Sequence, residues 1–181
     1  MIDSSFGAGG SNITYDVDVT ANPMVTVRVI LDDLTGDEIK GKGSGTLNIH
    51  SGTNERLSMR GRFDIDEGDY LFTFQSFFKK PFEIRKGTTN YISWSGDPYA
   101  AKIQFEAVYT AENVSFSPLA SAIPDQYARL RDNVYVVVNL TGDLFKPDFK
   151  FSLAFPPNSK ANSDFSVASS IQQMEKNPNE M

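Results

Sequence analysis

Apolar and polar residues alternate along most of the chain, and this period of two restricts the fold more than any other feature. The first run places Ile13, Tyr15, Val17 and Val19 between polar neighbours. Such alternation is typical of β-strands that bury one face. Similar runs follow at 25–31, 47–49, 57–65, 70–74, 82–84, 92–94, 103–109, 134–140 and 149–153. The pattern predicts about ten strands at roughly ten-residue intervals, separated by turn residues.

No helical rhythm interrupts this series, which excludes a parallel α/β sheet with crossover helices. We therefore expect an all-β, mostly antiparallel fold. The segment 110–132 is too long for an ordinary hairpin loop, and we expect a helical turn at 125–130 within it. The glycine-rich string GKGSG (41–45) is interpreted as a turn that precedes the strand at 47–49.

Ten strands spaced by about 4.8 Å would form a sheet roughly 50 Å wide. A sheet of that width usually curls or splits into two layers. Curling would give a trough with an apolar inner face, whereas splitting would give a two-layer β-sandwich with a filled core. The alternation identifies the inward residues but does not decide between these two architectures.

The length of 181 residues fits one domain with a sizeable core. We expect a flexible Gly/Ser-rich lead-in at 1–12, a β domain at 13–157, and a polar tail at 158–181 that can form a short helix at 166–176. No apolar run approaches the roughly 18 residues of a membrane-spanning helix. The polar tail reads as truncated, so we expect further chain beyond Met181.

The composition removes several classes of function. Lys and Arg number 17 against 23 Asp and Glu, so the formal net charge is −6, which disfavours binding to nucleic acid. One histidine and no cysteine exclude thiol chemistry and most transition-metal sites. The 14 Phe, 7 Tyr and 1 Trp favour strands and large apolar surfaces.

No set of residues in the sequence supports catalysis. The string Asp64–Asp69 holds four carboxylates and a glycine, but the glycine is one place early for a calcium loop, so a polar hairpin corner is the better interpretation. Glu83, Glu106 and His50 fall on the polar faces of their strands, and a single histidine forms no catalytic triad. We expect a protein that is not an enzyme and that has no catalytic residues, metal or cofactor.

Two aromatic segments leave alternatives open. Trp94 and Tyr99 flank SGDP and could form a platform for a sugar, although Trp94 also continues the inward phase of Ile92 and would then pack in the core. The run Phe77-Phe78-Lys79-Lys80-Pro81-Phe82 suits a protected sheet edge, a contact with lipid headgroups, or a simple strand–turn boundary.

An ordered series of short motifs between Thr46 and Pro157 resembles a known family. It comprises GRFDI (61–65), GDYLF (68–72), FEIRKG (82–87), WSGDP (94–98), IQFEAVY (103–109), LTGDL (140–144) and FPP (155–157). The series is similar to the C-terminal domain of TamB, the translocation and assembly module protein related to AsmA-like proteins. The strings FFKKPFEIRKG and SGDPYAA are similar to the Bacteroidota version of this domain.

This resemblance implies a periplasmic protein that bridges two membranes, anchored at the inner membrane and reaching the outer membrane. In the family, a long curled sheet carries a lipid-facing groove, and its C-terminal end meets a BamA-like outer-membrane barrel protein. The family is linked both to phospholipid movement and to assembly of outer-membrane proteins.

The leading hypothesis is therefore a non-enzymatic, lipid-conducting trough in which phospholipid acyl chains lie along the apolar face. We expect its lining to consist of Phe63, Tyr70, Phe72, Phe74, Phe82, Trp94, Phe105, Val136 and Phe151. The alternative is an interaction module that offers strand edges to the barrel or its clients by β-augmentation. A sugar-binding sandwich is a third hypothesis.

Overall fold

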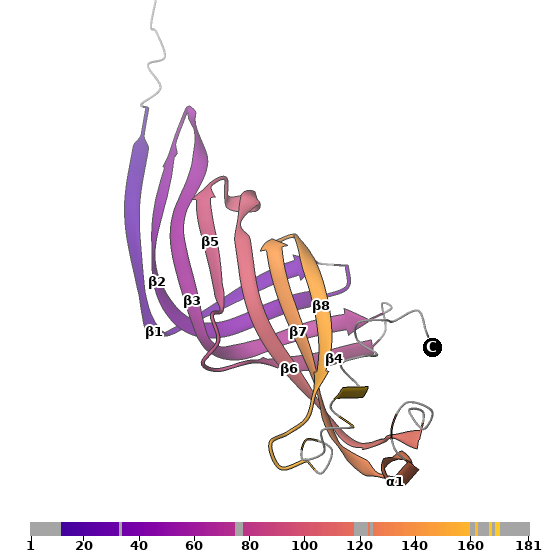
Figure 1. Cartoon of the computed structure of the whole chain (residues 1–181). Coiled ribbons are helices and arrows are strands. Elements are labelled where there is room, and N and C mark those ends of the chain that lie inside the picture. Colours follow the sequence, from indigo (N-terminus) through magenta and orange to yellow (C-terminus); the bar gives the residue numbers. More distant parts are fainter. Residues whose placement is uncertain are drawn as a thin grey trace, which may run out of the picture.

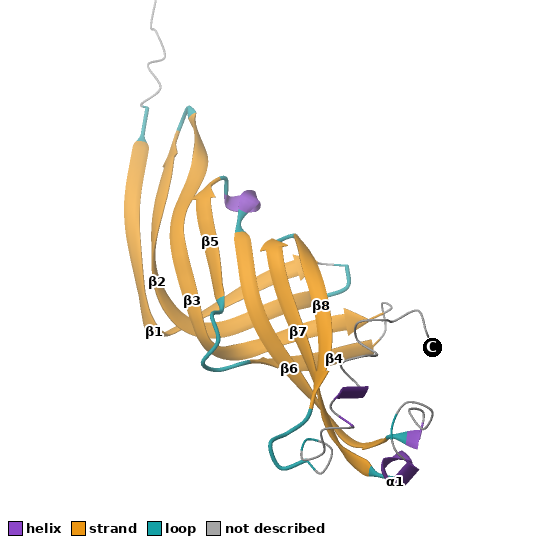
Figure 2. Ribbon diagram, in the orientation of Figure 1, coloured by secondary structure: helices purple, strands orange, loops and turns teal. Residues whose placement is uncertain are grey.

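The computed structural model describes residues 12–32, 34–74, 78–117, 123, 125–159, 162, 167, 169 and 170, without the side chains of Phe74, Phe78 and Tyr127. These residues form one eight-stranded antiparallel sheet (Figures 1 and 2). The strands are β1 (Thr14–Asp32), β2 (Asp37–Gly52), β3 (Glu55–Phe74), β4 (Phe78–Ile84), β5 (Tyr91–Gly96), β6 (Lys102–Ser115), β7 (Arg131–Asp143) and β8 (Lys146–Ala154).

The strands follow the order β1-β2-β3-β4-β6-β7-β8, and β5 lies between β3 and β6 in line with β4. The first half of β3 pairs with β5 from Met59 to Asp64, and its second half pairs with β4 from Asp69 to Phe74. Neighbouring strands are antiparallel throughout. The prediction of an all-β, mostly antiparallel, curled sheet is confirmed.

The sheet has eight strands instead of about ten because two expected pairs of strands are continuous. The runs at 13–19 and 25–31 join in β1, and those at 57–65 and 70–74 join in β3. Register shifts at Ala21/Val25 and Lys42/Gly43 mark where the strands bend. A bulge bends a strand without ending its pairing, so the turn residues at these positions do not reverse the chain.

The glycines of GKGSG do not form the expected turn, because they lie inside β2 at its bend. A Cβ on Gly43 would lie 1.8 Å from the carbonyl oxygen of Asp64, and one on Gly45 would lie 2.1 Å from that of Arg62. The backbones of β2 and β3 therefore approach too closely for any larger residue. These glycines allow the tight curvature of the sheet.

The bends divide β1, β2 and β3 into two arms. The upper arm comprises 14–21, 44–52 and 55–64 together with β5, and the lower arm comprises 25–32, 37–43 and 65–74 together with β4 (Figure 1). The lower arm folds across the sheet toward β8, where the ring of Phe72 contacts those of Phe149 and Phe151. The sheet thereby encloses its own inner face.

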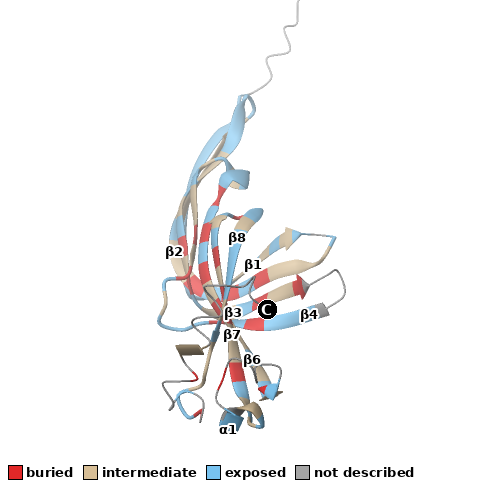
Figure 3. Cartoon of the chain, turned by 45° about the vertical axis from the view of Figure 1, so that its right-hand side comes forward, coloured by how far each residue is buried: buried red, intermediate tan, exposed pale blue. Residues whose placement is uncertain are grey.

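The core lies on this inner face, where cross-strand neighbours form apolar rows. One row runs through Ala21, Gly45, Phe63, Ile92 and Ile103. The adjacent outer row is polar, with Thr20, Thr46, Arg62, Ser93 and Lys102. Figure 3 shows buried residues gathered around the middle of the sheet and exposed residues toward its upper end.

A smaller apolar cluster lies at the far end of β6 and β7. Phe116, Ile123, Val134 and Val167 are buried there, and Phe155 packs against them. Helix α1 (Asp125–Ala128) lies in the long connection between β6 and β7, which confirms the expected helical turn. Of the helix expected at 166–176, only 167, 169 and 170 are described, and all three are helical. The lead-in at 1–11 lies outside the described residues.

Candidate functional site: the inner face of the curled sheet

The inner face carries the larger of the two apolar clusters among the described residues, and the period of two places its side chains. Along β6, Ile103, Phe105, Ala107 and Tyr109 face inward, and the residues between them face outward. Their partners on β7 and β8 extend the same rows; Phe105 is opposite Leu140, which is opposite Phe149. The inner face is thus one continuous surface from β1 to β8.

The predicted lining residues differ widely in exposure. Four of them are buried, each with at most 4% of the residue's surface exposed: Phe63, Tyr70, Phe82 and Phe105. Phe72, Trp94 and Val136 are half-buried against this core, and Phe151 is 47% exposed. Phe74 belongs to β3, but its side chain lies outside the described part of the structure. The middle of the predicted lining is therefore packed.

Besides Phe151 and its neighbours on β8, the inner face is accessible on the upper arm, where none of the exposed residues was among the predicted lining. Tyr15, Val17, Val19 and Leu57 share the inward phase of Phe63, and each is between 43% and 49% exposed. We call these four residues the open face. Alternation identifies these residues as inward. Their exposure arises because three of them lie on edge strand β1 and Leu57 lies near the end of β3, and the sequence does not reveal either position.

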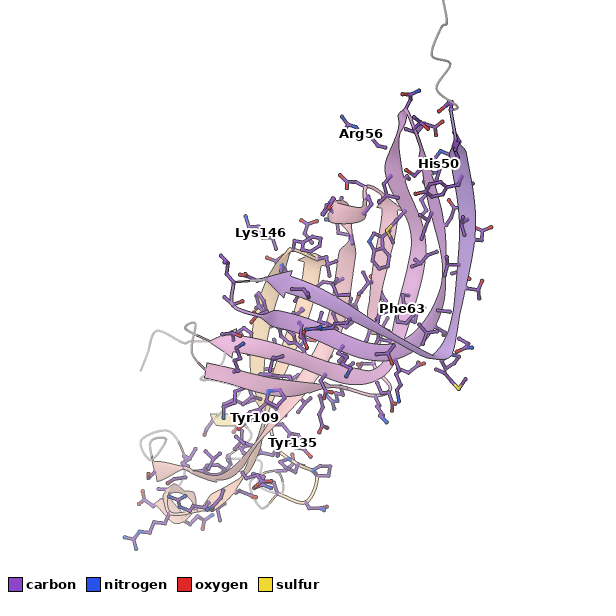
Figure 4. All side chains as sticks on the ribbon, turned by 180° about the vertical axis from the view of Figure 1, so that it is seen from behind. His50, Arg56, Phe63, Tyr109, Tyr135 and Lys146 are labelled. Atoms are coloured by element: carbon purple, nitrogen blue, oxygen red, sulfur yellow. The ribbon has the colours of Figure 1, made fainter. Side chains whose placement is uncertain are left out.

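An aromatic cluster closes the opposite side of the inner face. The ring centroid of Phe72 lies 5.9 Å from that of Phe149 and 5.7 Å from that of Phe151. Phe82 contacts both Phe72 and Tyr109 with centroid distances of 6.1 and 5.7 Å. Figure 4 labels Phe63, near the bend between the two arms, and Tyr109, on β6. Aromatic packing therefore holds the lower arm against β8.

The lysine- and proline-containing run lies in β4, beside a partly unpaired edge. In the described structure only Glu83 and Ile84 of β4 pair with β6. The preceding residues Lys79, Lys80 and Pro81 pair with β3 alone, so their other edge is free of a described neighbouring strand. Lys80 Nζ lies 3.3 Å from the hydroxyl of Tyr109 and 5.1 Å from the centroid of its ring. This placement favours the protected-edge interpretation of the run.

The polar residues considered for chemistry form surface pairs. Arg85 bonds Glu106 at 2.7 Å, and Arg62 bonds Asp64. Lys86 donates to Glu67 at 3.0 Å, and this hydrogen bond lowers the pKa of that carboxyl. Burial raises the pKa of Tyr70, whose hydroxyl has no hydrogen-bond partner in the described structure. No group of three or more His, Cys, Asp or Glu that could hold a metal occurs among the described residues.

The two aromatic residues of the suggested sugar platform occupy different environments. Trp94 packs against the core on the inner face, and its Nε1 donates to the carbonyl oxygen of Pro98 at 3.2 Å. Tyr99, in the 3-10 helix η1 (Pro98–Ala100), is 79% exposed. The interpretation of Trp94 as a core residue is therefore favoured.

Comparison with protein families gives one clear result: the family model described as the TamB C-terminal domain matches residues 8–174. No curated protein and no solved structure matches the chain. The matched family is a transport and assembly module of the cell envelope and is not a known enzyme family. None of the helices in the described residues has the length and apolar character needed to cross a membrane.

Proposed function

The chain belongs to the TamB C-terminal domain family, and from that premise we propose that its inner face carries phospholipid acyl chains as part of a periplasmic bridge between the two membranes. The coarser role, outer-membrane protein assembly or lipid transport, comes with the family. In the native protein, an inner-membrane anchor and contact with a BamA-like outer-membrane barrel would complete the bridge.

One observation supports this proposal above the others: the continuous inner face includes the open face, whose four apolar residues are each between 43% and 49% exposed. Tyr15, Val17 and Val19 lie along edge strand β1, and Leu57 lies on β3 beyond them. Exposed apolar patches of this kind usually mark a binding surface. Each methylene that an acyl chain buries there contributes about 0.8 kcal/mol.

Within this proposal the predicted lining residues have different roles. Phe63, Tyr70, Phe82 and Phe105 form the fixed floor, because they are already buried. Trp94, next to Gly61 in the row that includes Val19, extends the open face inward. Phe72, Val136 and Phe151 border the far side of the inner face, where an acyl chain would pass the aromatic cluster. Phe74 stays a predicted lining residue whose side chain lies outside the described part of the structure.

The test compares two substitutions on adjacent residues of β1. Val19→Asp places a carboxylate on the open face, whereas Thr20→Asp places the same group on the polar outer face. Both residues are exposed, so neither change should prevent folding. We expect Val19→Asp to weaken binding of a fluorescent acyl-chain probe by about tenfold or more, because the carboxylate must be desolvated, and Thr20→Asp to leave binding unchanged.

Far-ultraviolet circular dichroism would verify that both variants are folded. Native mass spectrometry of the chain purified from envelopes would report whether phospholipid is retained. If the wild type and Val19→Asp bind the probe equally well, the proposal that acyl chains bind on the open face is contradicted.

A second candidate function is docking by strand addition, and the two free sheet edges favour it. In the described structure β1 and β8 each pair with one neighbour only, so each has one edge available to a partner strand. The family supports a protein partner in the outer-membrane assembly machinery.

Cysteine substitution can test this candidate without interference, because the chain has no cysteine. Asp148→Cys lies on edge strand β8, and Thr141→Cys is its cross-strand neighbour on β7. A BamA-like barrel with cysteines on its own exposed edge should form a disulfide with the first variant and not with the second. Failure to form it at Asp148 and at comparable positions of β1 would count against strand addition.

A further inference from the structure

The two outer strands of the sheet differ in how well their edges are protected against pairing. Strand β8 contains Pro147, which has no N–H to donate, and the exposed Lys146 and Lys150. Proline and lysine are common on edge strands because they discourage the addition of another strand. The segment 14–20 of β1 contains neither residue type, and its register with β2 has no bulge. This segment, which we call the β1 edge, is therefore the more receptive of the two.

The backbone of the β1 edge has free hydrogen-bonding groups at every second residue. The carbonyl oxygen of Ile13 accepts from the backbone N–H of Thr53 at 3.0 Å. Because neighbouring residue pairs of an antiparallel ladder alternate between bonded and non-bonded, the odd-numbered residues from 13 to 19 bond β2. The even-numbered residues direct their N–H and C=O groups away from the sheet, on the side where no described strand lies: Thr14, Asp16, Asp18 and Thr20.

The side chains of the β1 edge divide between the two faces of the sheet. Tyr15, Val17 and Val19 belong to the open face and are each between 43% and 49% exposed. Asp16 and Asp18 lie on the outer face and are exposed. An added strand would place alternate side chains beside the open face, so apolar residues are favoured at those positions. The residues between them would lie opposite the two aspartates.

The charges around the two aspartates favour basic residues opposite them. Asp18 has no cation partner among the described residues. Asp16 lies 3.4 Å from His50, which also bonds Glu55. The Glu55 carboxylate accepts from the hydroxyl of Thr14 at 3.4 Å, so it too lies beside β1. Three carboxylates therefore share one histidine at this edge.

The other cations of this face lie further from the β1 edge. Arg56 and Arg60 belong to β3, about two strand spacings, or roughly 10 Å, from β1. Figure 4 labels Arg56 and His50 on this arm, and in the described structure no ion pair joins either arginine to the three carboxylates. At about 0.1 M salt, exposed charges that far apart are largely screened. A side chain directly opposite an aspartate would be only about 5 Å away.

We propose that the β1 edge binds a strand of a partner protein in which lysine or arginine alternates with apolar residues. The proposal rests on the strand-addition function above and names the class of strand that this edge takes. The basic residues lie opposite Asp16 and Asp18, and the apolar residues continue the open face. A second copy of the chain is a poor occupant, because antiparallel pairing of two β1 edges centred on Asp16, Val17 or Asp18 brings aspartates opposite each other.

Two fluorescently labelled peptides test the class of strand. The peptide TVKVKVT reads the same in both directions and matches residues 14–20, with its lysines opposite the two aspartates. In TVEVEVT glutamates replace the lysines. Fluorescence anisotropy with the 181-residue chain should show about tenfold tighter binding of the basic peptide, because opposite charges attract across the pair and like charges repel. Methylation of the backbone nitrogens of both lysines removes N–H groups that face β1 and should weaken binding by about tenfold or more.

Charge-reversed variants show whether the preference arises at β1. Asp16→Lys/Asp18→Lys should prefer TVEVEVT by a similar factor, and Asp16→Asn/Asp18→Asn should bind both peptides equally. Both aspartates are exposed, so these variants should fold, which circular dichroism verifies. Asp148→Asn removes an exposed carboxylate from edge strand β8 and serves as the matched control, which should keep the wild-type preference.

The outcomes separate this proposal from strand addition itself. If the methylated peptide binds as tightly as its parent, strand addition at β1 is contradicted and the proposal with it. If methylation weakens binding but the wild type binds the basic and acidic peptides equally, strand addition stands and the basic class of strand is wrong. The proposal is also overturned if the wild type binds neither peptide, if the charge-reversed variant keeps its preference for TVKVKVT, or if Asp148→Asn loses that preference. A dimer of the chain that TVKVKVT dissociates, seen by analytical ultracentrifugation, would identify a second copy as the occupant instead.

Discussion

His50 connects three strands on the polar outer face. Its Nε2 bonds the carboxylate of Glu55, and its Nδ1 lies 3.4 Å from Asp16. The hydrogen bond to Glu55 is the largest cause of the raised pKa of His50, above its ordinary value of 6.5. A raised pKa means that the folded chain binds the proton more tightly than the unfolded chain. The stabilisation is therefore present below pH 6.5 and is lost as pH rises through the folded pKa.

This arrangement predicts a pH-dependent melting temperature. The melting temperature of the wild type should be higher just below pH 6.5 than above the folded pKa of His50. The variant His50→Gln cannot titrate in this range, so its melting temperature should lack this difference. Because His50 is the only histidine, its NMR titration gives the pKa directly, and Glu55→Gln should lower it. A His50 pKa at or below 6.5 in wild type would contradict this interpretation of the contacts.

At the scale of elements, the bends in β2 and β3 determine the curl of the sheet. A glycine inside a strand usually weakens it, but at Gly43 the backbone of the neighbouring strand occupies the place of a side chain. Register shifts on β1 and β2 lie at the same level of the sheet. The two arms therefore depend on close backbone contact as well as on apolar burial.

Gly43→Ala should destabilise the fold by about 2 kcal/mol or more, because the added Cβ meets backbone atoms that cannot move aside. The neighbouring change Ser44→Ala adds no atom and should alter stability little. Urea denaturation of both variants measures the difference. A Gly43→Ala variant as stable as wild type would show that the strands can separate at the bend without cost.

At the scale of the whole molecule, side-chain packing closes the sheet on itself. The lower arm and β8 have no described backbone pairing between them, and Phe72 contacts Phe149 and Phe151 across this gap. Closure therefore rests on side-chain packing, which includes these aromatic contacts and the apolar cluster that joins Ile39 and Tyr70 of the lower arm to Leu140 of β7, whereas each arm is held by continuous hydrogen-bonded ladders.

Phe72→Ala should loosen this closure while the strands remain paired. We expect a loss of about 2 kcal/mol in unfolding free energy, less than for a fully buried ring, because Phe72 is half-buried. Binding of the dye ANS should rise while the far-ultraviolet circular dichroism spectrum is retained. Tyr99→Ala, in the exposed 3-10 helix η1, serves as the control for loss of an aromatic ring. Unchanged dye binding in Phe72→Ala would indicate that other contacts keep the sheet closed.

The sequence by itself determined the fold class and the face on which each side chain lies. The period of two is a local property of strands, so it placed Phe63, Phe105 and Val17 on the same side without knowledge of their neighbours. The order of short motifs likewise indicated the family. These signals depend only on residues close together in the chain.

Only the tertiary structure decided which of these inward residues are covered. Phe105 is 2% exposed and Val17 is 45% exposed, although both alternate with polar neighbours in the same way. The difference arises because β6 has partners on both sides and faces the packed interior, whereas β1 is an edge strand. Burial depends on strands brought together from distant parts of the chain by bends at glycines and bulges, and local periodicity carries no information about that closure.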